Sequence, residues 1–222
     1  HLTTHAFFKA CLFLGAGAVL HALAGEEDMR KMGGLAKQMP FTTTVFLLAT
    51  LALCGVPPFA GFFSKDEILW AAWSAGQGSP LLWLVASAAS FLTAFYMFRL
   101  VFMTFFGPSR VSAPLQHRIH EPPPSMSVVL GLLAFGSVVA GFIGLPQLWR
   151  EWLGLPAPFY DFLAPVLGHF APRAGVAHST ELVLMLVAVC VALAGIALAW
   201  LVYGREPLAA SARPAGALRT LV

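Results

Sequence analysis

Hydrophobic residues dominate the chain in five long stretches, which short polar connections separate. The stretches cover residues 1–23, 41–75, 81–106, 126–145 and 181–203. A hydrocarbon core about 30 Å thick is crossed by about 20 apolar helical residues. Continuous apolar runs of this length favour helices over the short alternating strands of a closed barrel. The pattern therefore predicts an all-α, polytopic membrane helix bundle with five transmembrane helices.

The second stretch, 41–75, is too long for one simple span and carries helix-breaking residues at its centre. These are Gly55, Pro57, Pro58 and Gly61. Proline lacks a backbone donor and clashes with the preceding helical turn. The carbonyl groups that such a break frees need protein or water as partners, since lipid offers none. We expect a broken helix here, a feature that membrane transporters use to build ion paths.

Composition excludes most other classes of protein. Of 222 residues, 59% are hydrophobic and 10% are charged, and the mean hydropathy is +0.80. A soluble domain carries about a quarter charged residues. The 19 Phe, 6 Trp and net charge of +3 are incompatible with disorder. The scattered Lys and Arg form no nucleic-acid recognition motif, and the three Cys, far apart in apolar runs, have no metal or redox spacing.

Charge in the connections predicts the orientation of the bundle. If all five stretches cross, 24–40, 107–125 and 204–222 share one side. They hold eight Lys and Arg: Arg30, Lys31, Lys37, Arg110, Arg118, Arg205, Arg213 and Arg219. The other side, 76–80 and 146–180, holds Arg150 and Arg173. The positive-inside rule places the first set in the cytoplasm. Segment 146–180, rich in aromatic residues and Pro, is typical of a membrane interface.

Five charged residues lie inside the predicted spans: Lys9, Lys65, Asp66, Glu67 and Arg99. Each costs at least about 2.5 kcal/mol at the bilayer centre, so such residues normally face the bundle interior and serve a function. His1, His5 and Lys9 are spaced four residues apart and share one helix face. Histidine titrates near neutral pH, and a desolvated lysine approaches the same range. This row predicts a proton relay.

Other interpretations of the row remain open. His1 and His5 form an HxxxH pair, but the Glu that a zinc protease places after the first His is Leu2 here. The polar side chains could also serve only as hydrogen-bonding partners between helices. His21 lies off this face, near the predicted cytoplasmic end, and its role stays open.

Lys65 and Asp66 follow directly after the predicted break. If Lys65 faces the same interior as Lys9, a proton on one lysine affects the affinity of the other for its own proton. The alternative is that Lys65 and Asp66 neutralise each other and extend outward to the interface. Glu67 is expected nearer the outer surface, and Arg99 is within reach of the cytoplasmic interface.

Three of these motifs resemble one family. HLTTHAFFKACLFLG at 1–15 resembles a stretch of the antiporter-like subunit L of respiratory complex I, the proton-pumping NADH:quinone oxidoreductase. GEEDMRKMGGL at 25–35 is similar to its next connection. GVPP at 55–58 with GFFSKDEIL at 61–69 is similar to its second broken helix. The similarity is dense over 1–107, and beyond 107 it is topological only.

The resemblance implies roles for individual residues. It places His1, His5 and Lys9 in a central hydrophilic axis, and Lys65, with Asp66 beside it, at the distal exit. It also implies that a first broken helix lies upstream of His1, so the chain would be a C-terminal fragment holding the exit half of a proton path. Residues 204–222 are too short for the long lateral helix of that subunit.

The sequence thus predicts part of a proton-translocating antiporter-like domain at 1–107 and a C-terminal membrane region at 108–222. The protein would be a translocase subunit of a bacterial inner membrane, with no redox chemistry of its own. NADH, FMN, iron–sulfur clusters and quinone are expected in other subunits, and neighbouring antiporter-like subunits and lipid as partners. Two alternatives remain: the large subunit of an Mrp-type sodium/proton antiporter, and a scaffold that transports nothing.

Overall fold

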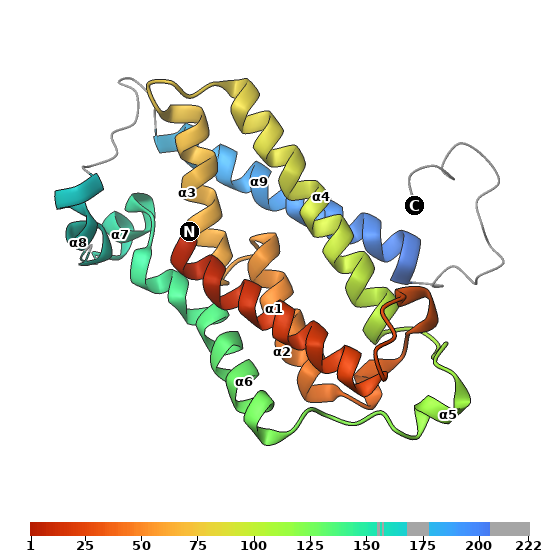
Figure 1. Ribbon diagram of the computed structural model, residues 1–222. Helices are drawn as coiled ribbons and strands as arrows, with labels where there is room; N and C mark the ends of the chain where they lie inside the picture. The colour runs from red at the N-terminus through yellow and green to blue at the C-terminus, as the bar shows by residue number, and fades with distance from the viewer. Residues whose placement is uncertain (155, 157, 168–177, 205–222) are drawn as a thin grey trace.

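The computed structural model describes residues 1–154, 156, 158–167 and 178–204, and its regular elements in these ranges are helical (Figure 1). The longer helices are α1 (Leu2–Ala22), α2 (Pro40–Cys54), α3 (Ala60–Ser74), α4 (Pro80–Phe105), α6 (Pro124–Val139) and α9 (His178–Ala199). Short elements are η1 (Met29–Lys31), η2 (Leu35–Lys37), α5 (Ala113–Gln116), η3 (Ala140–Gly144), α7 (Gln147–Leu153), α8 (Pro158–Leu167) and η4 (Trp200–Gly204).

Four helical segments of the described chain are long and apolar enough to cross a membrane. They are Leu2–Ala22, Pro80–Phe105, Pro124–Gly144 and Ser179–Gly204. Each coincides with one of the predicted spans. The remaining predicted span, 41–75, is occupied by α2 and α3, which have 15 residues each. At 1.5 Å per residue, each of these two helices is about 22 Å long and falls short of a full crossing by itself.

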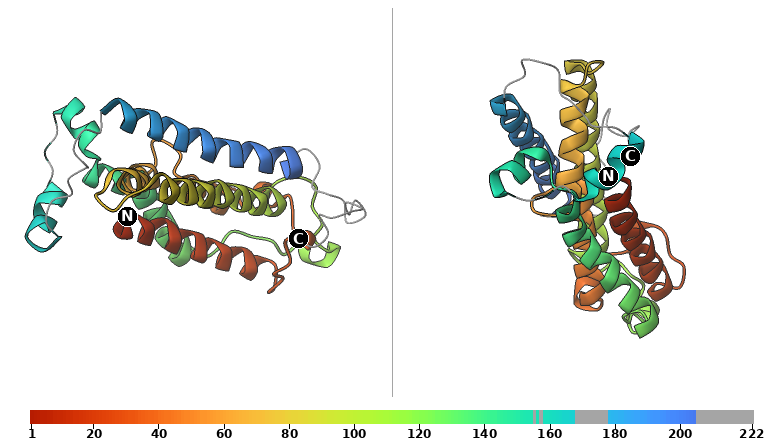
Figure 2. Two further views of the ribbon diagram at one scale, coloured as in Figure 1. Left: turned by 90° about the horizontal axis from the view of Figure 1, so that it is seen from above. Right: turned by 90° about the vertical axis from the view of Figure 1, so that its left-hand side faces the viewer.

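The helices pack in layers. α1, α2 and α6 contact one another, and α4 packs along α9. Figure 2 shows α4 lying between α9 and α1. Gly195 allows α9 to approach α4 closely, because a Cβ atom there would lie 2.6 Å from the carbonyl oxygen of Phe91. α3 contacts α2, α4 and α9, so it lies where the two groups of helices meet.

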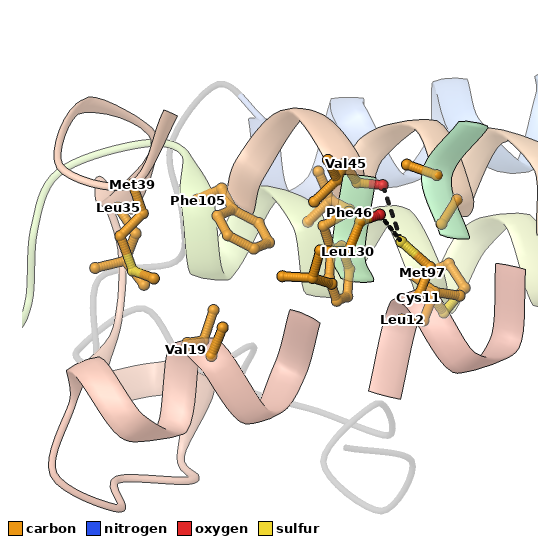
Figure 3. Close-up of a cluster of buried hydrophobic side chains, with 14 of the residues drawn as sticks. Cys11, Leu12, Val19, Leu35, Met39, Val45, Phe46, Met97, Phe105 and Leu130 are labelled. Carbon is orange, nitrogen blue, oxygen red and sulfur yellow. Dashed lines mark hydrogen bonds between the residues drawn. The ribbon is translucent and has the colours of Figure 1, made fainter. Parts of the chain in front are cut away.

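The core between α1, α2 and α6 is apolar and closely packed (Figure 3). Cys11 on α1 is fully buried there, and its thiol reaches the carbonyl oxygens of Val45 at 3.7 Å and Leu130 at 3.8 Å. Phe46 packs against Phe105 of α4, with ring centroids 5.2 Å apart. Cys11 therefore acts as a small buried side chain, as its apolar surroundings in the sequence indicate.

Two connections meet at one end of the bundle. The Arg110 side chain donates to the backbone carbonyls of Arg30 at 2.9 Å, Met29 at 3.3 Å and Met103 at 2.7 Å. Partial burial lowers the pKa of Arg110 below its usual value. The Glu121 carboxylate accepts the backbone N–H groups of Phe41 and Thr42, and so caps the first turn of α2.

The opposite end carries α7 and α8, which follow α6 and η3 and lie on the left in Figure 1. Arg150 belongs to α7. The other arginines used to predict orientation there and in the C-terminal connection lie outside the described residues: Arg173, Arg205, Arg213 and Arg219. Of segment 146–180, residues 155, 157 and 168–177 also lie outside the described residues.

Candidate functional site

The predicted row on α1 is partly assembled. The rings of His1 and His5 have centroids 5.8 Å apart, and the His5 ring packs against Phe8 at 5.3 Å. His1 is exposed, whereas His5 and Lys9 are partly buried. The Lys9 ammonium lies 5.6 Å from the centroid of the Phe13 ring, one turn further along α1. The structure thus brings the two histidines together, and the Lys9 side chain extends along α1 toward Phe13.

Ser64 connects α1 to α3. The His1 Nδ1 atom lies 2.9 Å from the Ser64 hydroxyl oxygen. The Thr4 hydroxyl donates to the same oxygen, also at 2.9 Å. Ser64 directly precedes Lys65, so the start of the α1 row meets α3 beside the second group of predicted residues.

Glycines shape the turn that positions Lys65. α2 ends at Gly55, whose φ of 76° lies in the left-handed region that favours glycine. Its N–H donates to the carbonyl of Ala52 and the N–H of Val56 donates to that of Leu51, which satisfies the last turn. A Cβ atom at Gly61 would overlap the Ala52 carbonyl oxygen. The first turn of α3 can therefore lie directly against the last turn of α2.

Lys65 and Asp66 border a small, partly open cavity of about 270 Å³, a volume that includes the space at its mouth. The cavity lies between α3, the end of α2, α4 and α9. Its lining residues are Cys54, Gly55, Phe62, Lys65, Asp66, Leu69, Ser90, Ala188, Val189 and Ala192. The enclosed part of this space has room for about one water molecule. Among the described lining residues, none comes from α1.

Asp66 is the more buried member of the pair. Asp66 is 9% exposed, whereas Lys65 is partly exposed and its side chain lies over Gly55. Two further carboxylates, those of Glu67 and Glu181, are close enough to interact electrostatically with Asp66. Glu181 lies in the first turn of α9. An acid, a base and two further carboxylates therefore gather around one break in the apolar bundle.

Glu67 belongs to a second polar group, at the end of the bundle that carries α7 and α8. The Tyr160 hydroxyl donates a hydrogen bond to the Glu67 carboxylate. The Arg150 guanidinium lies 4.8 Å from the centroid of the Tyr160 ring, and its Nε donates to the carbonyl of Leu145. Burial, together with the Glu67 charge, raises the pKa of Tyr160 to about 12. Tyr160 is therefore a neutral donor at physiological pH.

Apolar contacts hold this second group against α3. Trp149 of α7 packs on Phe62 and Phe63, with ring centroids 6.4 Å and 6.3 Å apart. Gly141 lets η3 approach the start of α3, because a Cβ atom there would lie 2.6 Å from the Cα atom of Ala60. Both contacts fix the beginning of α3, and with it the position of Lys65.

The two residues with open roles lie away from the cavity. The Arg99 guanidinium lies 5.5 Å from the centroid of the Tyr203 ring, and its buried Nε finds no hydrogen-bond partner among the described residues. His21 packs against His120, with ring centroids 5.8 Å apart. His21 is thus separated from the histidines at the start of α1 by almost the whole helix.

Sequence reasoning missed three contributors to the site: Ser64, Ser90 and Tyr160. Serine is frequent in membrane helices as a simple hydrogen-bonding group, so no sequence signal separates Ser64 or Ser90 from it. Tyr160 lies in a segment whose aromatic residues suit the interface in general. Their roles depend on contacts between segments far apart in the chain.

Residues 1–93 match the family described as NADH:quinone oxidoreductase/Mrp antiporter, transmembrane region. Subunit L of the NADH-quinone oxidoreductase of Mycobacterium tuberculosis is 45% identical over 214 residues, which cover 94% of this chain and 31% of that protein. Chain 5 of the NAD(P)H-quinone oxidoreductase of a Picosynechococcus strain is 45% identical over 172 residues, 66% of this chain and 26% of its own length.

A third relative is named as part of a ubiquinone oxidoreductase. Chain 5 of the NADH-ubiquinone oxidoreductase of Marchantia polymorpha is 43% identical over 162 residues, which cover 72% of this chain and 24% of that protein. The chain spans less than a third of the length of each of these relatives. Residues 1–93, which match the family model, include α1, the α2–α3 turn and the first half of α4.

Proposed function

Because the chain belongs to the antiporter-like family of subunit L and chain 5 of the NADH-quinone oxidoreductases, we propose that it carries protons across a membrane within complex I. The protons would move along buried His, Lys and Asp side chains toward the outer side. The redox reaction would take place in other subunits, where NADH, FMN, iron–sulfur clusters and quinone bind. The partners would be other membrane subunits, in particular a neighbouring antiporter-like subunit.

One observation carries this proposal: Lys65 and Asp66 border a cavity inside a bundle that has few charged residues. Intramembrane charges normally line a substrate or ion pathway. A lysine and an aspartate on one cavity can exchange a proton through water, since the lysine ammonium can give up a proton and the aspartate carboxylate can accept one. If the pair extended outward to the interface, Asp66 would be exposed, whereas it is buried in the structure.

The proposed path joins the two predicted groups through Ser64. An imidazole ring can both take up and release a proton, which suits His1 and His5 to a relay. The hydroxyl of Ser64 both donates and accepts, so it can connect His1 with the region of Lys65. Lys9 would exchange protons with His5 from the other direction along α1. His1, His5, Lys9, Lys65 and Asp66 are the residues to which we assign the relay.

We also propose that α2 and α3 form one interrupted crossing, which would make five crossings in all. Figure 1 shows both helices running toward the same end of the bundle, one after the other. Residues 1–107 would belong to the translocating domain, and 108–222 to a C-terminal membrane region that supports it. The end where Arg30 and Arg110 meet would face the cytoplasm of a bacterial cell.

The test is proton pumping by the intact complex with Lys65→Ala in its full-length subunit. We expect NADH-driven proton uptake into vesicles to fall strongly, while the amount of assembled complex stays the same. Lys37→Ala is the matched control, because Lys37 is exposed at the end of the bundle. Unchanged pumping in Lys65→Ala would contradict the proposal.

A sodium/proton antiporter is the second candidate, because the family description includes Mrp antiporters. The names of the relatives described above favour the oxidoreductase. Pumping driven by NADH in sodium-free buffer, and blocked by Lys65→Ala, is expected for the oxidoreductase subunit. Transport that needs sodium and proceeds without NADH oxidation would favour the antiporter.

A further inference from the structure

Ser90 of α4 is deeply buried and borders the same cavity as Lys65 and Asp66. The residue is 4% exposed, and its Oγ has no hydrogen-bond partner among the described residues. A buried hydroxyl without a partner is unfavourable, so such groups normally find one.

The usual hydrogen-bond partner of a serine hydroxyl in a helix is near Ser90, but Ser90 does not bond to it. Serine and threonine inside helices usually donate to the carbonyl four residues earlier. Among the described residues, hydroxyls that do so include those of Thr43, Thr44, Thr50, Ser64, Ser74, Thr93 and Ser137. Ser90 lies on a regular part of α4, where the same bond to Ala86 would be available. Its hydroxyl is left for a partner in the cavity.

Ser90 also lies at the depth of Lys65. It is about 15 Å along α4 from Pro80, and Lys65 is about 14 Å from the end of α3 at Ser74. The two helices are consecutive and contact each other. Both residues are therefore near the middle of a hydrocarbon core about 30 Å thick.

We propose that Ser90 is a positioning residue of the proton path, which holds a water molecule between Lys65 and Asp66; this rests on the proposed function. The water accepts a proton from the Lys65 ammonium and gives one to the Asp66 carboxylate, so the lysine becomes neutral and the aspartate becomes an acid. The water and the hydroxyl are unchanged at the end. A hydroxyl suits this role because it donates and accepts at once.

The test compares three variants of the full-length subunit in the intact complex: Ser90→Ala, Ser90→Thr and Ser87→Ala. Ser87 is the matched control, since it is 5% exposed on the same helix, is unpartnered among the described residues and is not part of the cavity lining given above. NADH-driven proton uptake is measured at equal amounts of assembled complex. We expect Ser90→Ala to lower the rate about three- to tenfold, the scale of one hydrogen bond, and Ser90→Thr to restore most of it.

Normal pumping in Ser90→Ala overturns the inference, as does an equal loss in Ser90→Ala and Ser87→Ala, because that would indicate packing alone. Failure of Ser90→Thr to recover the rate overturns it too. Lys65→Ala measured in parallel separates the two levels: if it stops pumping while Ser90→Ala does not, only this inference fails. If both pump normally, the proposed function fails.

A second measurement does not depend on how the variants assemble. A map of the wild-type complex that shows ordered water should place one within about 3.2 Å of Ser90 Oγ. A Ser90 hydroxyl bonded to the Ala86 carbonyl in that map, with no water beside it, would overturn the inference.

Discussion

The imidazole of His1, on α1, lies 2.9 Å from the hydroxyl of Ser64, on α3. This contact joins residues 63 positions apart and ends one residue before Lys65. Through this contact, the histidines at the start of α1 reach the residue that directly precedes Lys65.

Replacing Ser64 by Ala should therefore interrupt the path. The change removes the partner of both His1 and Thr4. We expect proton uptake by the intact complex to fall about three- to tenfold, the scale of a lost hydrogen bond. Ser64→Thr keeps the hydroxyl and should pump at a nearly normal rate. Equal rates in Ser64→Ala and the wild type would show that protons do not pass this contact.

Gly61→Ala should destabilise the turn between α2 and α3. The new methyl group would overlap the carbonyl oxygen of Ala52, so the first turn of α3 must move away from the last turn of α2. We expect a loss of about 1–3 kcal/mol in stability, typical of overpacking, measured by thermal unfolding of the purified complex. Gly17→Ala is the control, because no atom lies within 4 Å of a Cβ atom there. The same melting temperature for both variants would contradict the close approach.

The contact between Tyr160 and Glu67 should depend on pH in one direction. The folded protein raises the pKa of Tyr160 to about 12 from an ordinary value near 10. Because the pKa of Tyr160 is higher in the folded protein, the neutral phenol stabilises the fold at pH values below about 10. This stabilisation is lost between about pH 10 and 12, as the pH rises to the folded-state pKa of about 12. We expect Tyr160 in the folded protein to ionise with a midpoint near pH 12. The difference in ultraviolet absorbance between the wild type and Tyr160→Phe reports this ionisation, and a midpoint near 10 would contradict the contact.

Glu121→Ala should weaken the start of α2. The Glu121 carboxylate accepts the N–H of Phe41 at 2.6 Å and binds Thr42 through both its N–H and its hydroxyl. Loss of a carboxylate at a helix N-terminus costs about 1–2 kcal/mol. Thermal unfolding of the complex measures the loss. Glu27→Ala, at an exposed position of the same end, should leave the melting temperature unchanged.

Much of the fold follows from apolar runs and helix breakers. Continuous hydrophobic stretches located α1, α4, α6 and α9, since helix length in a bilayer is set by its thickness. The Pro and Gly residues at 55–58 lie between the end of α2 at Cys54 and the start of α3 at Ala60. Cys190 was harder to place: it is exposed, although its apolar sequence surroundings match those of buried Cys11.

The site could be predicted only in part. Charge in an apolar run identifies Lys65 and Asp66, because burial of charge is expensive wherever it occurs. The row of His1, His5 and Lys9 follows from helical spacing, but the direction in which Lys9 extends is decided by its neighbours. Ser90 has no such signal, because a single hydroxyl fits an apolar helix at little cost when it bonds to its own backbone.

The central claim is that Lys65 itself carries the transferred proton, and Lys65→Arg tests it most directly. Arginine keeps the positive charge and much of the length, but it does not release a proton in proteins. The measurement is the number of protons taken up per NADH oxidised by the intact complex in sealed vesicles. We expect Lys65→Arg to lose pumping as Lys65→Ala does. Wild-type pumping in Lys65→Arg would contradict the claim, because a fixed charge would then be sufficient.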